Sequence, residues 1–145
     1  MYRPMKGLKT SFSYTYSDFK FTEFDDDGVD QSGHLIPGIP EHHFTVAIDA
    51  YARSRWFARG KLQHASAFFV NNENTVKNDA YTTSQLSIGR DGNIGMFQWS
   101  VFFGLKNLFD NKYQANTRIN ASNNRFFEPA PPLNAYGGLS LAYHH

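Results

Sequence analysis

Strict alternation of apolar and polar residues recurs along the chain, and it is the feature that most limits the possible folds. In Leu8–Tyr16, for example, every even position except Thr10 is apolar or aromatic, whereas every odd position is polar. Successive side chains of a strand point to opposite sides, so the pattern predicts strands with one apolar and one polar face. We expect an all-β fold of about six antiparallel strands. The six segments are Leu8–Tyr16, His43–Tyr51, Trp56–Val70, Ser84–Ile88, Met96–Lys106 and Leu133–Tyr143.

Composition narrows the class of protein. Aromatic residues make up 17% of the 145 residues, the net charge is +1, and there is no cysteine. The weak charge gives no reason to expect a nucleic-acid partner, and the lack of cysteine excludes disulfides and thiolate metal sites. A transmembrane β-barrel has this balance, because half of each strand faces lipid and half faces a polar interior. A soluble β-sandwich has it too, so composition alone leaves both open.

The lengths of the connections favour the barrel. Tyr51–Trp56 and Arg90–Gly95 are short, and Asp91-Gly92 is a turn signal within the second. Short turns at one end and long loops at the other are typical of outer-membrane barrels. The long connections, rich in Asn, Asp, Gly and Pro, are Phe24–His42, Asn71–Tyr81 and Phe109–Pro132.

Three motifs carry a family resemblance. Asn107-Leu108-Phe109-Asp110 with Tyr113 downstream resembles the "NLFDxxY" signature near the end of TonB-dependent receptors. The stretch 125–132, which runs into a last strand at 136–143, is similar to the ending of ferric-siderophore members, and 35–42 resembles their "lPgvPxh" element. The residues that carry the signature are Asn107, Leu108, Phe109, Asp110, Tyr113, Phe127, Pro129, Pro131 and Tyr143.

The resemblance implies that residues 1–145 are the C-terminal part of a 22-strand barrel domain, without its plug domain. It implies energised uptake of an iron–siderophore or similar complex across the outer membrane of a Gram-negative bacterium. The implied partners are outer-membrane lipid, the rest of the barrel and the plug, TonB through an N-terminal part outside this chain, and the iron–siderophore ligand. No cofactor or enzymatic activity is expected. Only the three long loops are expected to touch ligand, and the family's usual terminal aromatic residue is replaced by His145.

Several local patterns have a plainer interpretation than the functional one they suggest. Glu23–Gly28 resembles part of a calcium loop, but its twelfth position is His34 rather than Glu, so we expect a solvated acidic loop. His42-His43 and His144-His145 are adjacent pairs, and neighbours on a strand point to opposite faces, so we expect no metal site.

Two further patterns lie on predicted strands. His64 and Ser66 suggest a hydrolase pair, but no nucleophile motif accompanies them, so catalysis is not expected. Arg59, Lys61 and Gln63 form a polar stripe that should face the barrel interior, where they could contact a plug or a passing anion. We favour the simpler interpretation, in which these residues form a hydrated barrel wall and contact neither a plug nor an anion.

Two rival classes remain open. One is a structural or adhesive outer-membrane barrel of eight strands, of which two would be hidden in the sequence. The other is a soluble β-sandwich that binds carbohydrate through its aromatic residues.

Overall fold

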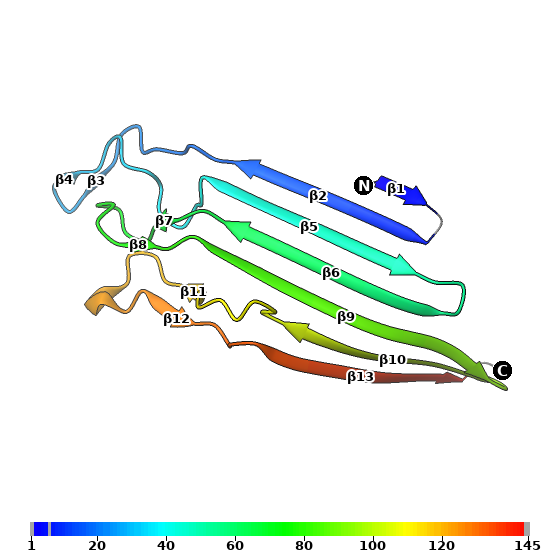
Figure 1. The fold of residues 1–145 in the computed structure, drawn as a ribbon. Helices are drawn as coiled ribbons and strands as arrows, with labels where there is room; N and C mark the ends of the chain where they lie inside the picture. Colours follow the sequence, from blue (N-terminus) through cyan, green and yellow to red (C-terminus); the bar gives the residue numbers. More distant parts are fainter. Residues whose placement is uncertain (1, 6, 144–145) are drawn as a thin grey trace.

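The computed structural model describes residues 2–5 and 7–143, which form one large antiparallel sheet and an end layer of loops (Figure 1). The seven strands of the sheet lie in the order β1-β2-β5-β6-β9-β10-β13. Their bounds are β1 Tyr2–Met5, β2 Leu8–Tyr16, β5 His42–Tyr51, β6 Trp56–Ala65, β9 Tyr81–Ile94, β10 Phe97–Lys106 and β13 Asn134–Tyr143. The loops contain the strands β3 Asp25–Asp26, β4 Val29–Asp30, β7 Phe68–Phe69, β8 Lys77–Asn78, β11 Gln114–Thr117 and β12 Phe127–Pro129, and a 3-10 helix, Ser122–Asn124.

All six predicted strands are present, and a seventh, β1, was not predicted. Its four residues offer too little alternation to be recognised, and they include Pro4, which is tolerated because β1 is an edge strand. The predicted strand Trp56–Val70 was too long. It ends at Ala65, and Phe68 lies in the separate strand β7, which pairs with β8.

The prediction of a turn at Asp91-Gly92 is wrong. Both residues lie within β9, paired with Ser100 and Trp99 of β10. A Cβ atom at Gly92 would collide with the indole ring of Trp99, so glycine is needed there for close packing rather than for a turn. The turn is made by Gly95, whose φ of +58° is readily adopted by glycine.

The register of the sheet places apolar residues beside apolar residues and polar residues beside polar residues. Phe12 pairs with Val46, and Val46 pairs with Leu62. One residue along, Ser13 pairs with Thr45, and Thr45 with Gln63. A slip of one residue would reverse the faces, so the alternation fixes the register. The apolar face carries Leu8, Phe12, Tyr14, Phe44, Val46, Ile48, Leu62, Leu86, Ile88, Trp99, Val101, Phe103, Leu105, Leu139 and Leu141.

The opposite side, the polar face, carries most of the charged and hydroxyl side chains of the strands. Its members include Lys9, Ser11, Ser13, Asp49, Arg59, Lys61, Gln63, Gln85, Ser87, Lys106 and Asn134, together with Phe57, Phe102 and Tyr136.

The apolar face is uncovered within the described part of the chain. Phe12 is 67% exposed and Leu139 is 76% exposed. A β-sandwich would bury these side chains against a second sheet, so this arrangement does not support the sandwich alternative. The sheet is open, with β1 and β13 at its two edges. No helix among residues 2–5 and 7–143 is long and apolar enough to cross a membrane.

The long connections all lie at one end of the sheet and the tight turns at the other (Figure 1). We name the long ones loop A (17–41), loop B (66–80) and loop C (107–133). The turns 52–55 and 95–96 lie at the opposite end, where β13 also finishes. The predicted asymmetry of long and short connections is therefore present.

Candidate functional site

The three long loops contact one another and form a continuous layer. The backbone N–H of Gly38 in loop A donates to the carbonyl of Phe69 in loop B at 2.8 Å. The N–H of Asn120 in loop C donates to the carbonyl of Val70 in loop B at 2.9 Å. Val70 is completely buried. Loop B is thus the centre of the layer, with loops A and C attached to it.

Asparagine side chains make most of the remaining connections. Asn72 and Asn120 form a reciprocal pair, in which the Asn72 N–H donates to Asn120 Oδ1 and Asn120 Nδ2 donates to Asn72 Oδ1, each at 2.9 Å. Asn72 Nδ2 also donates to Asp26 Oδ2 of loop A at 2.8 Å. Asn72 is only 7% exposed, so its amide needs these partners. One side chain therefore joins all three loops.

A second group of hydrogen bonds fixes loop A to loop B. Asn74 Oδ1 accepts from the N–H of Leu35 at 2.8 Å, and Asn74 Nδ2 donates to the carbonyl of Leu35 at 2.9 Å. His34 Nδ1 lies 2.8 Å from Gln31 Oε1 and 2.9 Å from the carbonyl oxygen of Asn72, both of which are acceptors. We call Asp26, Gln31, His34, Leu35, Asn72, Asn74 and Asn120 the amide cluster. The sequence showed Asn-rich loops but not this pairing, because residues that bond to one another in the cluster are up to 48 positions apart.

The structure places the signature residues Asn107–Asp110 at the end of β10, where they organise loop C. Asn107 has a φ of +54° and is 4% exposed. Its Oδ1 accepts from the N–H of Asn111 at 3.0 Å, and its Nδ2 donates to the carbonyl of Asn111 at 2.9 Å and to that of Pro131 at 3.3 Å. Asp110 Oδ1 accepts from the N–H of Leu133 at 2.8 Å. These contacts join the two ends of loop C.

The remaining signature residues have different surroundings. Leu108 donates its N–H to the carbonyl of Ser84, and Phe109 is 60% exposed. The ring of Tyr113 stacks on that of Tyr81 with 5.3 Å between centroids. Phe127 and Pro129 lie in β12, whereas Tyr143 lies at the far end of the sheet beside Phe97. The nine signature residues are therefore not gathered in one site, and those with described hydrogen bonds are structural.

Loop C contains a two-stranded ribbon in which β11 pairs with β12. Arg118 Nε donates to Glu128 Oε1 at 3.0 Å, and Asn116 Nδ2 donates to Glu128 Oε2 at 3.3 Å. The hydrogen bonds from Arg118 and then Asn116 hold the pKa of Glu128 below its ordinary value of 4.5. The pair is exposed, so we assign it little stabilisation.

The polar stripe Arg59, Lys61 and Gln63 lies on the polar face as predicted. The Arg59 guanidinium lies 4.6 Å from the centre of the Phe57 ring, and its Nε is 3.8 Å from Asp49 Oδ1. Gln63 donates to Thr45 Oγ1 at the long distance of 3.5 Å. Arg59 is thus partly neutralised within the sheet, which agrees with a hydrated wall better than with a strong anion site.

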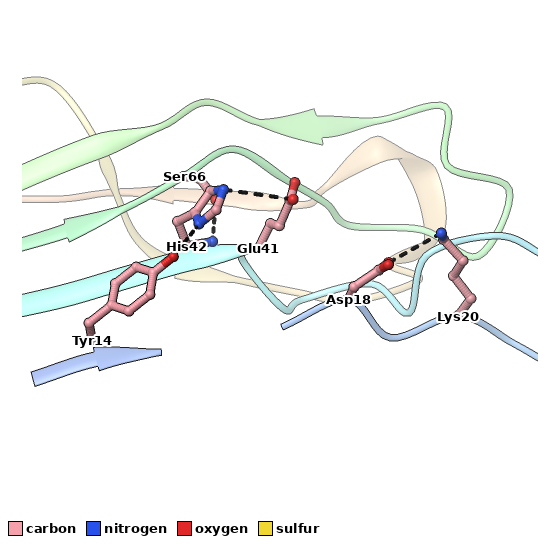
Figure 2. A network of polar contacts seen from close by, with 6 residues as sticks. All are labelled: Tyr14, Asp18, Lys20, Glu41, His42 and Ser66. Atoms are coloured by element: carbon pink, nitrogen blue, oxygen red, sulfur yellow. Dashed lines mark hydrogen bonds and ion pairs between the residues drawn. The ribbon is translucent and has the colours of Figure 1, made fainter. Parts of the chain in front are cut away.

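Figure 2 shows the edge of the apolar face next to the loops. The hydroxyl of Tyr14 lies 2.9 Å from His42 Nδ1, and Glu41 Oε1 lies 3.7 Å from His42 Nε2. The N–H of His42 donates to Ser66 Oγ at 3.0 Å. Tyr14, Glu41 and His42 are exposed, so this edge of the sheet presents aromatic and polar groups together at its surface.

The other candidate motifs make local contacts within the described residues. His64 Nδ1 is 2.9 Å from Thr82 Oγ1, and Ser66 bonds instead to the N–H of His42. Asp25 Oδ1 accepts from the N–H of Gly28 at 2.7 Å, which is a local turn contact. Across residues 2–5 and 7–143 no set of three His, Asp or Glu side chains is arranged to hold a metal. His144 and His145 lie outside the described residues.

Comparison with known proteins places this sheet and its loops in a family. The family model described as "TonB dependent receptor-like, beta-barrel" matches residues 2–108. Among solved structures, the ferric citrate transporter FecA in its unliganded form is 22% identical with a TM-score of 0.79, and covers 94% of this chain. The ferric preacinetobactin receptor BauA of Acinetobacter baumannii is 17% identical with a TM-score of 0.77, over 95% of this chain. The siderophore receptor PiuA of the same species is 14% identical, also with a TM-score of 0.77, over 96%. This chain spans 21%, 20% and 20% of those three proteins.

Proposed function

The chain belongs to the TonB-dependent receptor β-barrel family, and from that premise we propose that it forms the C-terminal part of such a receptor's barrel. The proposal covers residues 1–145 and places them in the outer membrane of a Gram-negative bacterium. The remaining strands of the 22-strand barrel and the plug would come from the rest of the receptor. TonB would act through that part and not through this chain.

One observation carries the proposal: a single sheet has an exposed apolar face, a polar face and long loops at one end only. Exposed apolar side chains such as Phe12, Leu139 and Leu141 are costly in water and favourable in hydrocarbon. The polar face then lines an aqueous interior, and the loop end faces the medium. An eight-strand closed barrel would need strands that the described sheet does not have.

We propose that the cargo is an iron–siderophore or similar iron complex, which this segment contacts through loops A, B and C. The family and the names of its structural relatives support this assignment. The amide cluster supports it too, because loops held in one arrangement lose less conformational entropy when they bind a ligand. The family is one of receptors and transporters, and we propose no catalytic step for this chain.

Site-directed labelling tests location and orientation. The chain has no cysteine, so a cysteine introduced into it is the only one within these residues, and the receptor without the substitution gives the background. Glu23→Cys lies in loop A and Arg53→Cys in the opposite turn, and both side chains are exposed. In intact cells we expect a bulky, membrane-impermeant maleimide to label Cys at 23 and not at 53. Equal labelling of both, or labelling only at 53, would contradict the proposed orientation.

Uptake of radioactive iron tests the function. Cells that lack the receptor's gene should take up less of the ferric complex than cells in which it is restored. The difference should vanish when TonB is deleted or the proton gradient is collapsed. Uptake that is independent of TonB would contradict energised transport.

A further inference from the structure

One charged side chain lies on the apolar face of the sheet. Among the paired residues of β2, β5, β6, β9, β10 and β13 on that face, Arg90 is the only Lys, Arg, Asp or Glu. It is exposed and makes no ion pair with a described residue. Because β6 and β10 already flank β9, further strands of a barrel would not cover it. An unpaired guanidinium on an apolar face requires an anion or water from outside the chain.

The guanidinium of Arg90 lies over the ring of Trp56. Its Cζ atom is 5.7 Å from the centre of the ring, and the two residues are paired between β6 and β9. Trp56 is the first residue of β6 and follows the turn 52–55, so the pair lies near the turn end of the sheet. A guanidinium that rests on an aromatic ring is oriented by it, and its N–H groups stay available to a second partner.

An apolar groove adjoins the ring of Trp56. Leu8, Ala50, Ala58 and Ile88 form one cross-strand row of the face, in which each residue is paired with the next. The two alanines are small, so the row is hollow between its larger ends. The groove has a volume of about 320 Å³, within the range of small-molecule sites. Its lining includes Leu8, Ala50, Ala52, Trp56, Ala58 and Ile88.

We propose that Arg90, Trp56 and this groove bind one anionic phospholipid, such as a phosphatidylglycerol. The phosphate oxygens would accept hydrogen bonds from the Arg90 guanidinium, whose planar set of donors suits phosphate. An acyl chain would fill the groove between Leu8 and Ile88. The inference rests on the proposed function, which places this face in lipid.

The order of the two parts matches the polarity of a lipid in a bilayer. Arg90 and Trp56 are paired in the row nearer the turn, and Ala58 and Ile88 are paired in the next row of the same face, two residues farther from the turn. A phosphate at the first row would therefore lie toward the water and a chain at the second row toward the hydrocarbon. A net anionic lipid is favoured over a zwitterionic one, because the cation of a zwitterionic headgroup already neutralises its phosphate.

Quenching of Trp56 by brominated lipids tests the site in the intact receptor. The receptor is reconstituted in phosphatidylcholine vesicles with a small fraction of lipid that carries bromine on its acyl chains, either phosphatidylglycerol or phosphatidylcholine. Bromine quenches an indole that the chain touches, and the contribution of Trp56 is the difference between each receptor and its Trp56→Phe counterpart. We expect phosphatidylglycerol to associate about fivefold more strongly than phosphatidylcholine, as for one arginine near a lipid surface.

Two matched pairs of variants separate the charge from the groove. Arg90→Gln should abolish the preference for phosphatidylglycerol, whereas Arg59→Gln, which removes the same charge from the polar face, should retain it. Ala58→Phe fills the groove with an apolar side chain and should also remove most of the preference. Val46→Phe adds bulk to the same face outside the groove and should retain it. Each variant is compared with itself in brominated phosphatidylcholine, so a general change in stability cancels.

The possible outcomes decide between this site and simpler alternatives. A preference that survives Arg90→Gln would overturn the site. A preference that Arg90→Gln abolishes but Ala58→Phe leaves intact would also overturn it, because the arginine would then attract headgroups without seating a chain. If both brominated lipids quench Trp56 equally while labelling at 23 and 53 and TonB-dependent uptake hold, only this inference fails. If neither lipid quenches Trp56, the apolar face does not lie in the bilayer, and the proposed function itself fails.

Discussion

The sheet and the loop layer are held together in opposite ways. Seven of the ten buried non-glycine side chains among the described residues lie in the loops, and three lie in the sheet. The sheet relies on long hydrogen-bonded ladders, such as the ten residue pairs between β10 and β13. The loops rely on side-chain amides, among which Asn72 bonds to both loop A and loop C.

This difference follows from the surroundings of each region. In the proposed membrane setting, the strands direct their side chains to lipid on one face and to water on the other, so only their backbone groups must be paired within the chain. The loops have no regular ladder, so their backbone groups and amides must satisfy one another. A side chain of the wrong polarity should therefore destabilise the sheet, and the loss of side-chain hydrogen bonds should destabilise the loops.

The largest expected effect is a charge on the apolar face. Val46→Arg would place a guanidinium between Phe12 and Leu62 in mid-strand, which should cost about 2–4 kcal/mol near the bilayer midplane. Thr45→Arg, one residue away, would direct the same group to the polar face and should cost little. Urea titration of the barrel in lipid vesicles, followed by the fluorescence of Trp56 and Trp99, measures both. Equal costs would show that the two faces are not lipid and water.

A smaller effect is expected where an aromatic ring covers a glycine of the sheet. A Cβ at Gly104 would lie 2.5 Å from the ring of Tyr136, so Gly104→Ala should displace that ring and cost about 1–3 kcal/mol. Gly60 is also within a strand, but a Cβ there would have no neighbouring atom within 4 Å, so Gly60→Ala is the matched control. The same vesicle titration compares them. A Gly60→Ala variant as unstable as Gly104→Ala would show that ring packing is not the cause.

The sequence predicts the sheet better than the loop layer, and the same difference between the two regions explains why. The strands were predictable because a sheet with one apolar and one polar face imposes a period of two, which is present in Leu8–Tyr16 and five other segments. The turn was misplaced because Asp91-Gly92 has the composition of a turn, whereas Gly92 is required by the Trp99 ring on a neighbouring strand. No local pattern contains that information.

The loops show more clearly which contacts a sequence pattern cannot predict. Their positions and polarity were predicted, but the contact of Asn72 with Asn120 joins residues 48 apart, and Asn74 with Leu35 joins residues 39 apart. The stack of Tyr81 on Tyr113 has the same origin, because one ring comes from β9 and the other from loop C. The signature at Asn107 was found as a motif, and only the structure gave it a physical role in joining the ends of loop C.

The third prediction concerns the amide cluster. Asn72→Ala removes the side-chain bonds to Asp26 and Asn120, and at about 1 kcal/mol for each hydrogen bond it should loosen the loops by about 1–2 kcal/mol. Hydrogen exchange of loop amides should accelerate while exchange in β5 and β6 stays unchanged. Asn93→Ala, an exposed amide near the opposite turn, is the control. Faster exchange throughout the sheet would contradict the separation of the two regions.

The smallest expected effect is a pH dependence confined to the β11–β12 ribbon. Hydrogen bonds from Arg118 and then Asn116 lower the pKa of Glu128 from 4.5. A lowered folded-state pKa means that the pairing stabilises the ribbon fully above the ordinary carboxyl pKa and is lost as pH falls through the folded value. Carboxyl NMR of the detergent-folded chain should therefore show Glu128 titrating below an ordinary glutamate, with ribbon amides exchanging faster as it protonates. Glu128→Gln should remove that pH dependence and leave the exchange of the sheet unaltered. If the wild type and Glu128→Gln respond to acid alike, the ribbon is held by its backbone pairing alone, as the strands of the sheet are.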